Sequence, residues 1–259
     1  MTLDFENLMT VAALGLLIFL RVDARRFGAA DFDDETAVDS LRVWVRRATW
    51  YGLGIVLVLA AYFVFPRPEA VLHLRLGEDR VFALMAGLTL AMLGIGAAVL
   101  YAWWRFGEVK LPNGRAYPVG LLNSIVTAVI DEAAFRGILL GLLLLSNWPP
   151  VYAVAFQAVA YALATRLGGA GRPRSLLVVW LIAGLFNGWL TYMTGGIGAA
   201  VLAHALTRFA IFAATGHAGQ ITPSAASEDE AHELAETTGD GGLDVVPDRG
   251  PGGQLRPIE

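Results

Sequence analysis

Residues 124–145 read SIVTAVIDEAAFRGILLGLLLL. Two adjacent acids, Asp131 and Glu132, and the arginine Arg136 stand within a run that is otherwise almost wholly apolar. Charged side chains in a membrane-length segment are costly to insert and usually face the interior of a helix bundle. This stretch therefore predicts a membrane helix that carries a pathway or a reaction centre.

The helical spacing separates these three charges. Glu132 and Arg136 are four residues apart with the acid first, which predicts a structural ion pair on one helix face. Asp131 lies about 100° around the helix from Glu132, so its side chain can point at a different helix. A structural role is favoured for the pair, whereas structural and functional roles both stay open for Asp131.

The composition of the whole chain is that of an integral membrane protein. Of its 259 residues, 56% are hydrophobic, and the mean hydropathy is +0.57, which is more apolar than a soluble domain of this length. The sequence has no cysteine, which excludes disulfides, thiolate metal ligands and a cysteine nucleophile. Residues 218–259 carry nine acids and two arginines, a balance of −7 that leaves +3 for the rest of the net −4. This charge distribution gives no indication of nucleic-acid binding.

Seven apolar segments predict an all-α, polytopic transmembrane helical bundle of about seven spans. The segments are 8–20, 49–65, 82–104, 118–148, 149–165, 175–194 and 196–216. The fourth segment exceeds the roughly 20 residues of an untilted span, so we expect it to tilt, kink or break near Gly137 or Gly141. We divide the chain into N-terminal helices and loops (1–117), a core (118–216) and a disordered acidic tail (217–259).

Basic residues on the loops predict the orientation. With the N-terminus outside, twelve basic residues fall on inner loops and three on outer loops. The inner set is Arg21, Arg25, Arg26, Arg42, Arg46, Arg47, Arg105, Lys110, Arg115, Arg166, Arg172 and Arg174, and the outer set is Arg67, Arg75 and Arg80. The positive-inside rule therefore places the N-terminus outside and the acidic tail in the cytoplasm.

Three short patterns, in order, resemble the motifs of the CAAX prenyl protease and bacteriocin-processing family of membrane endopeptidases. The first, acid-Glu-x-x-x-Arg-Gly, begins at Asp131, where the family usually has glutamate. The second, an aromatic residue followed four residues later by histidine, is matched by Tyr161 and Thr165, so its histidine is replaced. The third, a histidine followed four residues later by asparagine, is matched by His204 and Arg208, so its asparagine is replaced.

The resemblance covers roughly residues 118–210 and implies a CAAX-protease-like core. In active relatives the first acid and the histidines activate water for attack on a peptide bond, and the asparagine helps to stabilise the oxyanion. Carried over by position, this implies Asp131 as the general base and His204 as its partner, with Glu132 beside them in the catalytic set. Thr165 and Arg208 are the altered members.

The two replacements bear on activity. Arg208 lies one helical turn from His204 on the same face, and the estimated depths bring Arg208 to the level of Asp131. We expect the two side chains to lie within about 4 Å, with Thr165 facing the same cavity. Because a paired carboxylate is a poor proton acceptor, this arrangement predicts weak or lost peptidase activity.

The leading interpretation is a membrane-embedded endopeptidase whose partners are membrane lipids and a peptide or protein substrate. The alternative is an inactive relative that acts as a scaffold, adaptor or immunity-type protein, with a cytoplasmic partner for its acidic tail. A small-solute transporter is disfavoured because the polar residues cluster in a few helices. There is no HExxH motif, and His73 and His217 stand at span ends, so no intact metal-ligand set is visible and the cofactor is unknown.

Overall fold

A computed structural model describes residues 4–29, 32–33, 41–109, 111–112, 114–168, 174–215 and 217–218. In order, its helices are α1 (Phe5–Val22), α2 (Leu41–Val64), α3 (Pro68–Val71), α4 (Arg80–Phe106), η1 (Gly114–Ala116), α5 (Tyr117–Glu132), η2 (Ala133–Leu139), α6 (Leu140–Leu145), α7 (Pro150–Leu167), α8 (Arg174–Thr194) and α9 (Gly198–Thr215). Two-residue strands β1 (Phe32–Asp33) and β2 (His217–Ala218) pair antiparallel. The predicted acidic tail begins with the two residues of β2, and the rest of it lies outside the described residues.

The described helices have the inside-out character of a membrane protein. Five of them are long and apolar enough to cross a membrane, namely Phe5–Val22, Leu41–Val64, Arg80–Trp104, Leu176–Thr194 and Gly198–Thr215. Their outer surfaces expose large apolar side chains, such as Phe63 at 78% and Leu93 at 67%, whereas Glu132 and Arg136 are fully buried. The chain is therefore an all-α, multi-pass integral membrane protein. The count of about seven spans adds α5–η2–α6 and α7, which carry buried polar residues, and stays a prediction.

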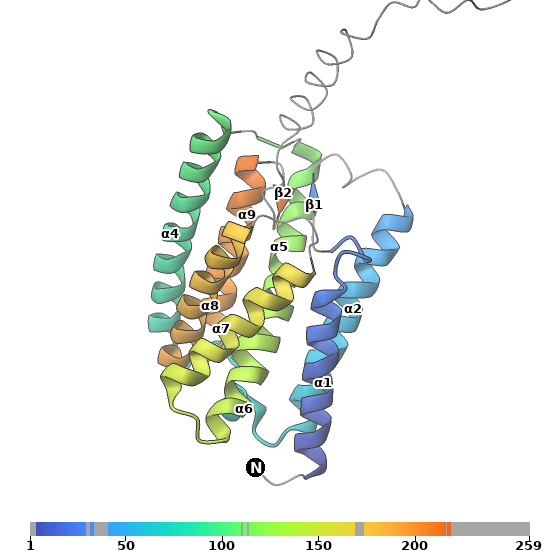
Figure 1. Ribbon diagram of the computed structural model, residues 1–259, viewed down its shortest axis with the longest axis vertical. Helices are drawn as coiled ribbons and strands as arrows, with labels where there is room; N and C mark the ends of the chain where they lie inside the picture. Colours follow the sequence, from blue (N-terminus) through green and yellow to red (C-terminus); the bar gives the residue numbers. More distant parts are fainter. Residues whose placement is uncertain are drawn as a thin grey trace, which may run out of the picture. The chain divides into compact units, whose positions relative to one another are not determined.

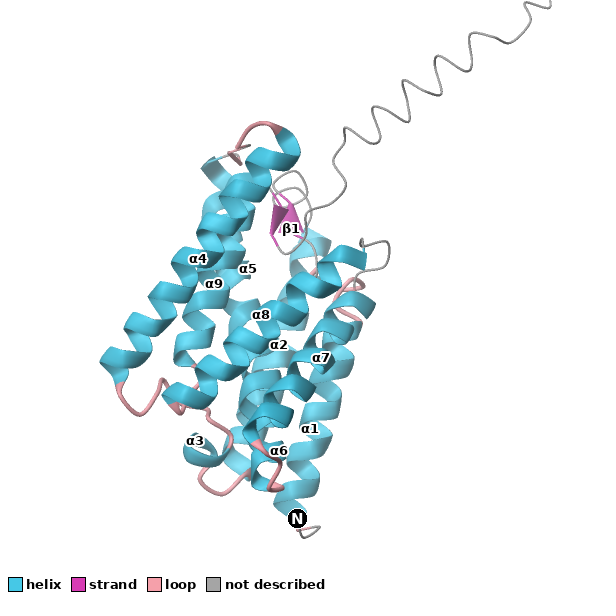
Figure 2. Cartoon of the chain, turned by 60° about the vertical axis from the view of Figure 1, so that its left-hand side comes forward, coloured by secondary structure: helices cyan, strands magenta, loops and turns pink. Residues whose placement is uncertain are grey.

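The bundle places α5 and α9 between two outer groups of helices. The first two long helices, α1 and α2, pack on each other, while α4 lies along α9 on the other side (Figure 1). Helix α9 also contacts α5 and α8, and α7 packs along α8. The start of α1, α3 and α6 lie at one end of the bundle, and β1 lies at the other (Figure 2). Charged residues of α5 are thus surrounded by other helices.

Near Gly137, where a tilt, kink or break is expected, the helix contains a π-helical stretch, η2, which joins α5 to α6 without a break in the helical chain. Extra residues in a π-helical turn shift the side chains that follow, and such turns are frequent at functional sites. The backbone at Val71 and Leu72 packs closely against this helix. A Cβ at Gly141 would lie 2.8 Å from the Cα of Leu72 and would clash with the Val71 carbonyl. A glycine is therefore required at this contact.

The segment before α4 holds the turn that leads into α9. The backbone carbonyl of His73 accepts a hydrogen bond from the amide of Ile197 at 3.0 Å, and Arg75 Nε donates to the Gly195 carbonyl at 2.7 Å. The amide of Glu78 donates to the last residue of α8 at 2.9 Å. These bonds fix the start of α9, which carries His204 and Arg208 into the bundle.

Candidate active site

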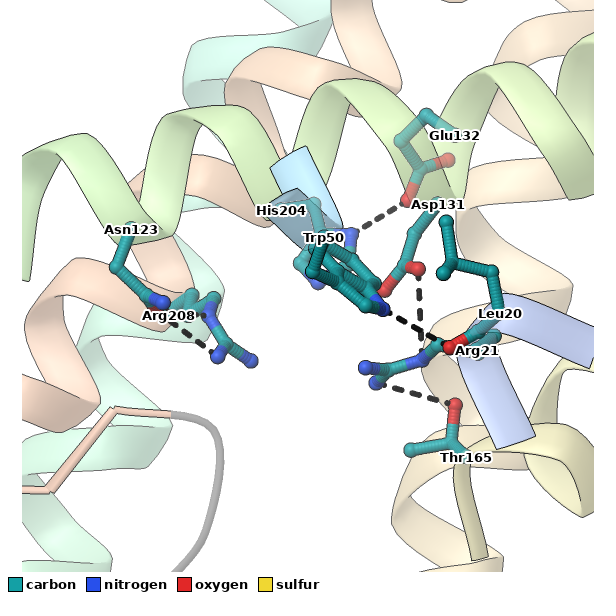
Figure 3. Close-up of polar contacts among 9 residues, drawn as sticks. All are labelled: Leu20, Arg21, Trp50, Asn123, Asp131, Glu132, Thr165, His204 and Arg208. Atoms are coloured by element: carbon teal, nitrogen blue, oxygen red, sulfur yellow. Dashed lines mark hydrogen bonds and ion pairs between the residues drawn. The ribbon is translucent and has the colours of Figure 1, made fainter. Parts of the chain in front are cut away.

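Glu132 collects contacts from three other parts of the bundle. Its Oε1 lies 2.7 Å from His204 Nδ1 of α9 and accepts a hydrogen bond from Asn187 Nδ2 of α8 at 3.2 Å (Figure 3 shows the contact with His204). Its Oε2 lies 3.3 Å from Arg136 Nε of η2. An ionised carboxylate only accepts hydrogen bonds, so His204 Nδ1 carries the proton of this contact and Nε2 is left to act on a reacting group.

Arg136 stands at the spacing that the sequence predicts for an intrahelical pair with Glu132. Its guanidinium is fully buried, and its Cζ lies 4.0 Å from the centre of the Tyr161 ring of α7. The face of an aromatic ring attracts a cation, most strongly where water is excluded. The Tyr161 ring also meets the His204 ring edge-on, with centroids 6.2 Å apart. Arg136 and Tyr161 therefore hold Glu132 and His204 in place.

Asp131 points away from this group, toward the end of α1. Its Oδ1 lies 3.4 Å from Arg21 Nε, and Arg21 Nη2 donates to Thr165 Oγ1 of α7 at 3.5 Å (Figure 3). Both distances are long for hydrogen bonds, but all three side chains are at most 5% exposed, so the charges are poorly screened. Within the described chain, Asp131 Oδ2 makes no hydrogen bond. Arg21 thus lies between Asp131, the acid of the first motif, and Thr165, the altered residue of the second motif, and contacts both.

The expected contact between Asp131 and Arg208 is wrong. Arg208 donates through Nε and Nη2 to the single oxygen Asn123 Oδ1, at 3.2 and 3.0 Å. Asn123 in turn donates to the Tyr51 hydroxyl of α2 at 2.6 Å. Among the described side chains, Arg21 is the cation within 4 Å of Asp131. Similar depth was insufficient to predict the contact because it did not fix the direction in which each side chain leaves its helix.

Arg21 is a site residue that the sequence analysis missed. The positive-inside count places Arg21 on an inner loop, yet it lies in the last turn of α1 and is 5% exposed. The carbonyl of the preceding residue, Leu20, accepts a hydrogen bond from Trp50 Nε1 of α2 at 2.9 Å, which anchors this turn. An arginine directly after an apolar helix is the ordinary signal of a membrane boundary, so only the packing of α1 on α7 identifies its role.

The predicted site residues thus form two groups and one separate residue. Glu132 and His204 contact each other, Asp131 and Thr165 are bridged by Arg21, and Arg208 is bound by Asn123 instead. Within the part of the chain that the structure describes, no three histidine, cysteine or acidic side chains lie close enough to hold a metal ion.

Comparison with known proteins gives one result. Residues 113–210 match a family model described as type II CAAX prenyl endopeptidase, Rce1-like. Comparisons with curated proteins and with solved structures give no match. The matched range contains Asp131, Thr165, His204 and Arg208, and it does not reach α1, which carries Arg21. Residues 113–210, the core of this membrane protein, are therefore similar to the Rce1-like family of type II CAAX prenyl endopeptidases.

Proposed function

We propose that this chain is a membrane-embedded endopeptidase of the CAAX type in which hydrolysis is weak. The observation that carries the proposal is the position of Arg21, 3.4 Å from Asp131 and 3.5 Å from Thr165. A general base must accept a proton from the attacking water. Arg21 Nε lies against Asp131 Oδ1, so this oxygen faces a cation instead of the attacking water.

The replacement at Thr165 acts in the same direction. Histidine at this position would offer an imidazole nitrogen that can accept a proton near neutral pH. A threonine hydroxyl does not take that role, and here its oxygen accepts a hydrogen bond from Arg21. Water between the first and second motifs would therefore lack the histidine as a second proton acceptor.

The contact between His204 and Glu132 favours weak activity over none. Glu132 is engaged by three side chains, so it is a positioning residue for His204 and a poor candidate for the base. An imidazole held through Nδ1 by a carboxylate keeps Nε2 available for proton transfer, as in other acid–base pairs. As an imidazolium, with a second proton on Nε2, His204 would then donate that proton to the leaving amine or to the developing oxyanion.

The setting of this reaction is also part of the proposal. The substrate is a peptide or protein segment that reaches the site from the lipid or from the cytoplasmic side, and the acidic tail binds a cytoplasmic partner. The N-terminus lies outside and the tail inside, which follows from the distribution of basic residues. With the buried Arg21 and Arg47 removed from the loop count, ten inner basic residues still face three outer ones.

The test is cleavage of a prenylated CAAX peptide by the purified protein in lipid nanodiscs. We expect slow cleavage that His204→Ala abolishes and that Arg26→Gln leaves unchanged, because Arg26 lies outside the bundle and its side chain is 81% exposed. Product formation that is the same with wild type, His204→Ala and empty nanodiscs would contradict weak activity and favour the inactive scaffold or adaptor.

A further inference from the structure

Among the described residues, the five buried charges nearest to the site do not balance; Arg47, also buried, donates to the Gly28 carbonyl and is not one of them. Asp131 and Glu132 supply two negative charges, whereas Arg21, Arg136 and Arg208 supply three positive ones, and all five are at most 5% exposed. Arg21 faces Asp131 and Arg136 faces Glu132. Within the described residues, Arg208 has no acidic group within 4 Å. A buried charge without a counter-charge is costly, most of all inside a membrane.

The contacts of Arg208 use only part of its guanidinium. Nε and Nη2 both donate to the one oxygen of Asn123, a neutral amide that is itself held by Tyr51. Figure 3 shows the outer end of the Arg208 guanidinium directed away from Asn123 and toward that of Arg21. Arginine carries five N–H donors in a planar fork that suits an oxyanion with two oxygens. The remaining donors of Arg208 are aimed at the region beside Arg21.

Two cations that point toward each other form an arrangement that an anion would stabilise. Arg21 and Arg208 are close enough to repel each other electrostatically, and Asp131 attracts both. The surplus of one positive charge among these five described residues matches a single carboxylate, whereas a phosphate monoester carries about −1.5 to −2 near neutral pH and would exceed it. A single carboxylate placed between the two guanidinium groups would balance the site.

The depth of Arg208 favours a peptide over a lipid as the source. Arg208 lies about 15 Å from the first residue of α9 and about 10 Å from the last, by rise along the helix. Phospholipid phosphates lie outside the hydrocarbon core, which is about 30 Å thick. A lipid headgroup would have to leave its layer to reach this position, whereas a peptide bound at the site would not.

We infer that Arg208 and Arg21 bind a carboxylate of the bound peptide. This inference rests on the proposed function, because it needs a peptide at the site. Arg208 makes the direct contact through its free donors, Asn123 fixes the plane of its guanidinium, and Arg21 faces the same carboxylate from the side of Asp131. Arg208 is a binding residue in this account and takes no part in proton transfer.

Equilibrium binding to the full-length protein in nanodiscs tests the inference. The probes are dansylated apolar tetrapeptides with a free C-terminal carboxylate, with a C-terminal amide, and with a C-terminal amide plus one internal glutamate. We expect the wild type to bind a carboxylate-bearing peptide at least about tenfold more tightly than the plain amide, a difference in binding free energy of about 1.4 kcal/mol. The internal glutamate distinguishes a side-chain carboxylate from a terminal one.

The variants assign the preference to a residue. Arg208→Gln should reduce the preference to less than twofold, Arg208→Lys should keep part of it, and the surface control Arg26→Gln should keep all of it. Equal binding of all three peptides to the wild type overturns the inference and leaves the proposed function standing, and this reading does not depend on how well any variant folds. A preference that survives in folded Arg208→Gln also overturns it. No binding of any peptide overturns both the inference and the proposed function.

Discussion

At the scale of single residues, Glu132 and Arg136 show how spacing and burial combine. The i,i+4 spacing places them on one helix face, and the fold then buries both completely. Removing Arg136 would leave Glu132 beside His204 and Asn187 without its cation. Breaking a buried pair in this way costs about 3–5 kcal/mol.

We therefore predict that Arg136→Ala lowers the free energy of unfolding by about 3–5 kcal/mol. The double variant Glu132→Gln with Arg136→Met should recover part of this loss, because it removes both charges at similar volume. Thermal unfolding of the detergent-solubilised protein is the measurement. Equal destabilisation by the single and the double variant would contradict the ion pair.

Local spacing could predict a pair within one helix, but not contacts between helices. Asp131 and Arg21 belong to helices far apart in the sequence, and nothing in the sequence around Arg21 distinguishes it from a boundary arginine. Arg208 illustrates the opposite error. Its similar depth in the membrane predicts a contact with Asp131, whereas its side chain contacts Asn123. The rotation of each helix about its axis decides such contacts, and that rotation depends on the packing of all its neighbours.

At the scale of elements, the helical run from 117 to 145 is shaped by an outside contact. The length of its apolar segment predicts a tilt, kink or break near Gly137 or Gly141, and the structure has the continuous π-helical stretch η2 there, which spans Gly137 but not Gly141. What the sequence could not show is the neighbour, since the chain at Val71 and Leu72 packs against Gly141. Close packing leaves no room for a methyl group at that contact.

We predict that Gly141→Ala destabilises the protein by about 1–3 kcal/mol, because its Cβ would clash with backbone atoms that a rotamer change does not move. Gly52→Ala is the matched control. Gly52 lies inside α2, where an added Cβ would meet no other atom within 4 Å, so alanine there should be neutral or stabilising by up to about 1 kcal/mol. Melting temperatures that fall equally in both variants would show that the contact with Val71 is unimportant.

At the scale of the whole molecule, composition was sufficient to predict a multi-pass, all-α membrane protein. The order of the helices agrees with alternating spans, because the start of α1, α3 and α6 share one end of the bundle (Figures 1 and 2). Which end faces the cytoplasm follows from the basic residues alone and stays a prediction.

Cysteine labelling tests this orientation in a chain that has no cysteine of its own. Ser224→Cys, in the tail outside the described residues, should be protected from an impermeant maleimide in intact cells and labelled after lysis. Ala70→Cys, on the exposed surface of α3 at the opposite end, should be labelled in intact cells. The reverse pattern would invert the predicted topology.

The weak hydrolysis proposed for this protein depends on Arg21 suppressing the chemistry of Asp131. The most direct test is the kcat of prenylated CAAX peptide cleavage, measured at saturating peptide because Arg21 is also proposed to bind the peptide carboxylate. The double variant Arg21→Gln with Thr165→His is compared with the wild type and with the same double variant carrying Asp131→Ala. Since general acid–base catalysis contributes about 10²–10⁴-fold, we predict that the double variant is on the order of 100-fold faster than the wild type and that Asp131→Ala removes the gain. A folded double variant that cleaves no faster than the wild type would contradict the claim.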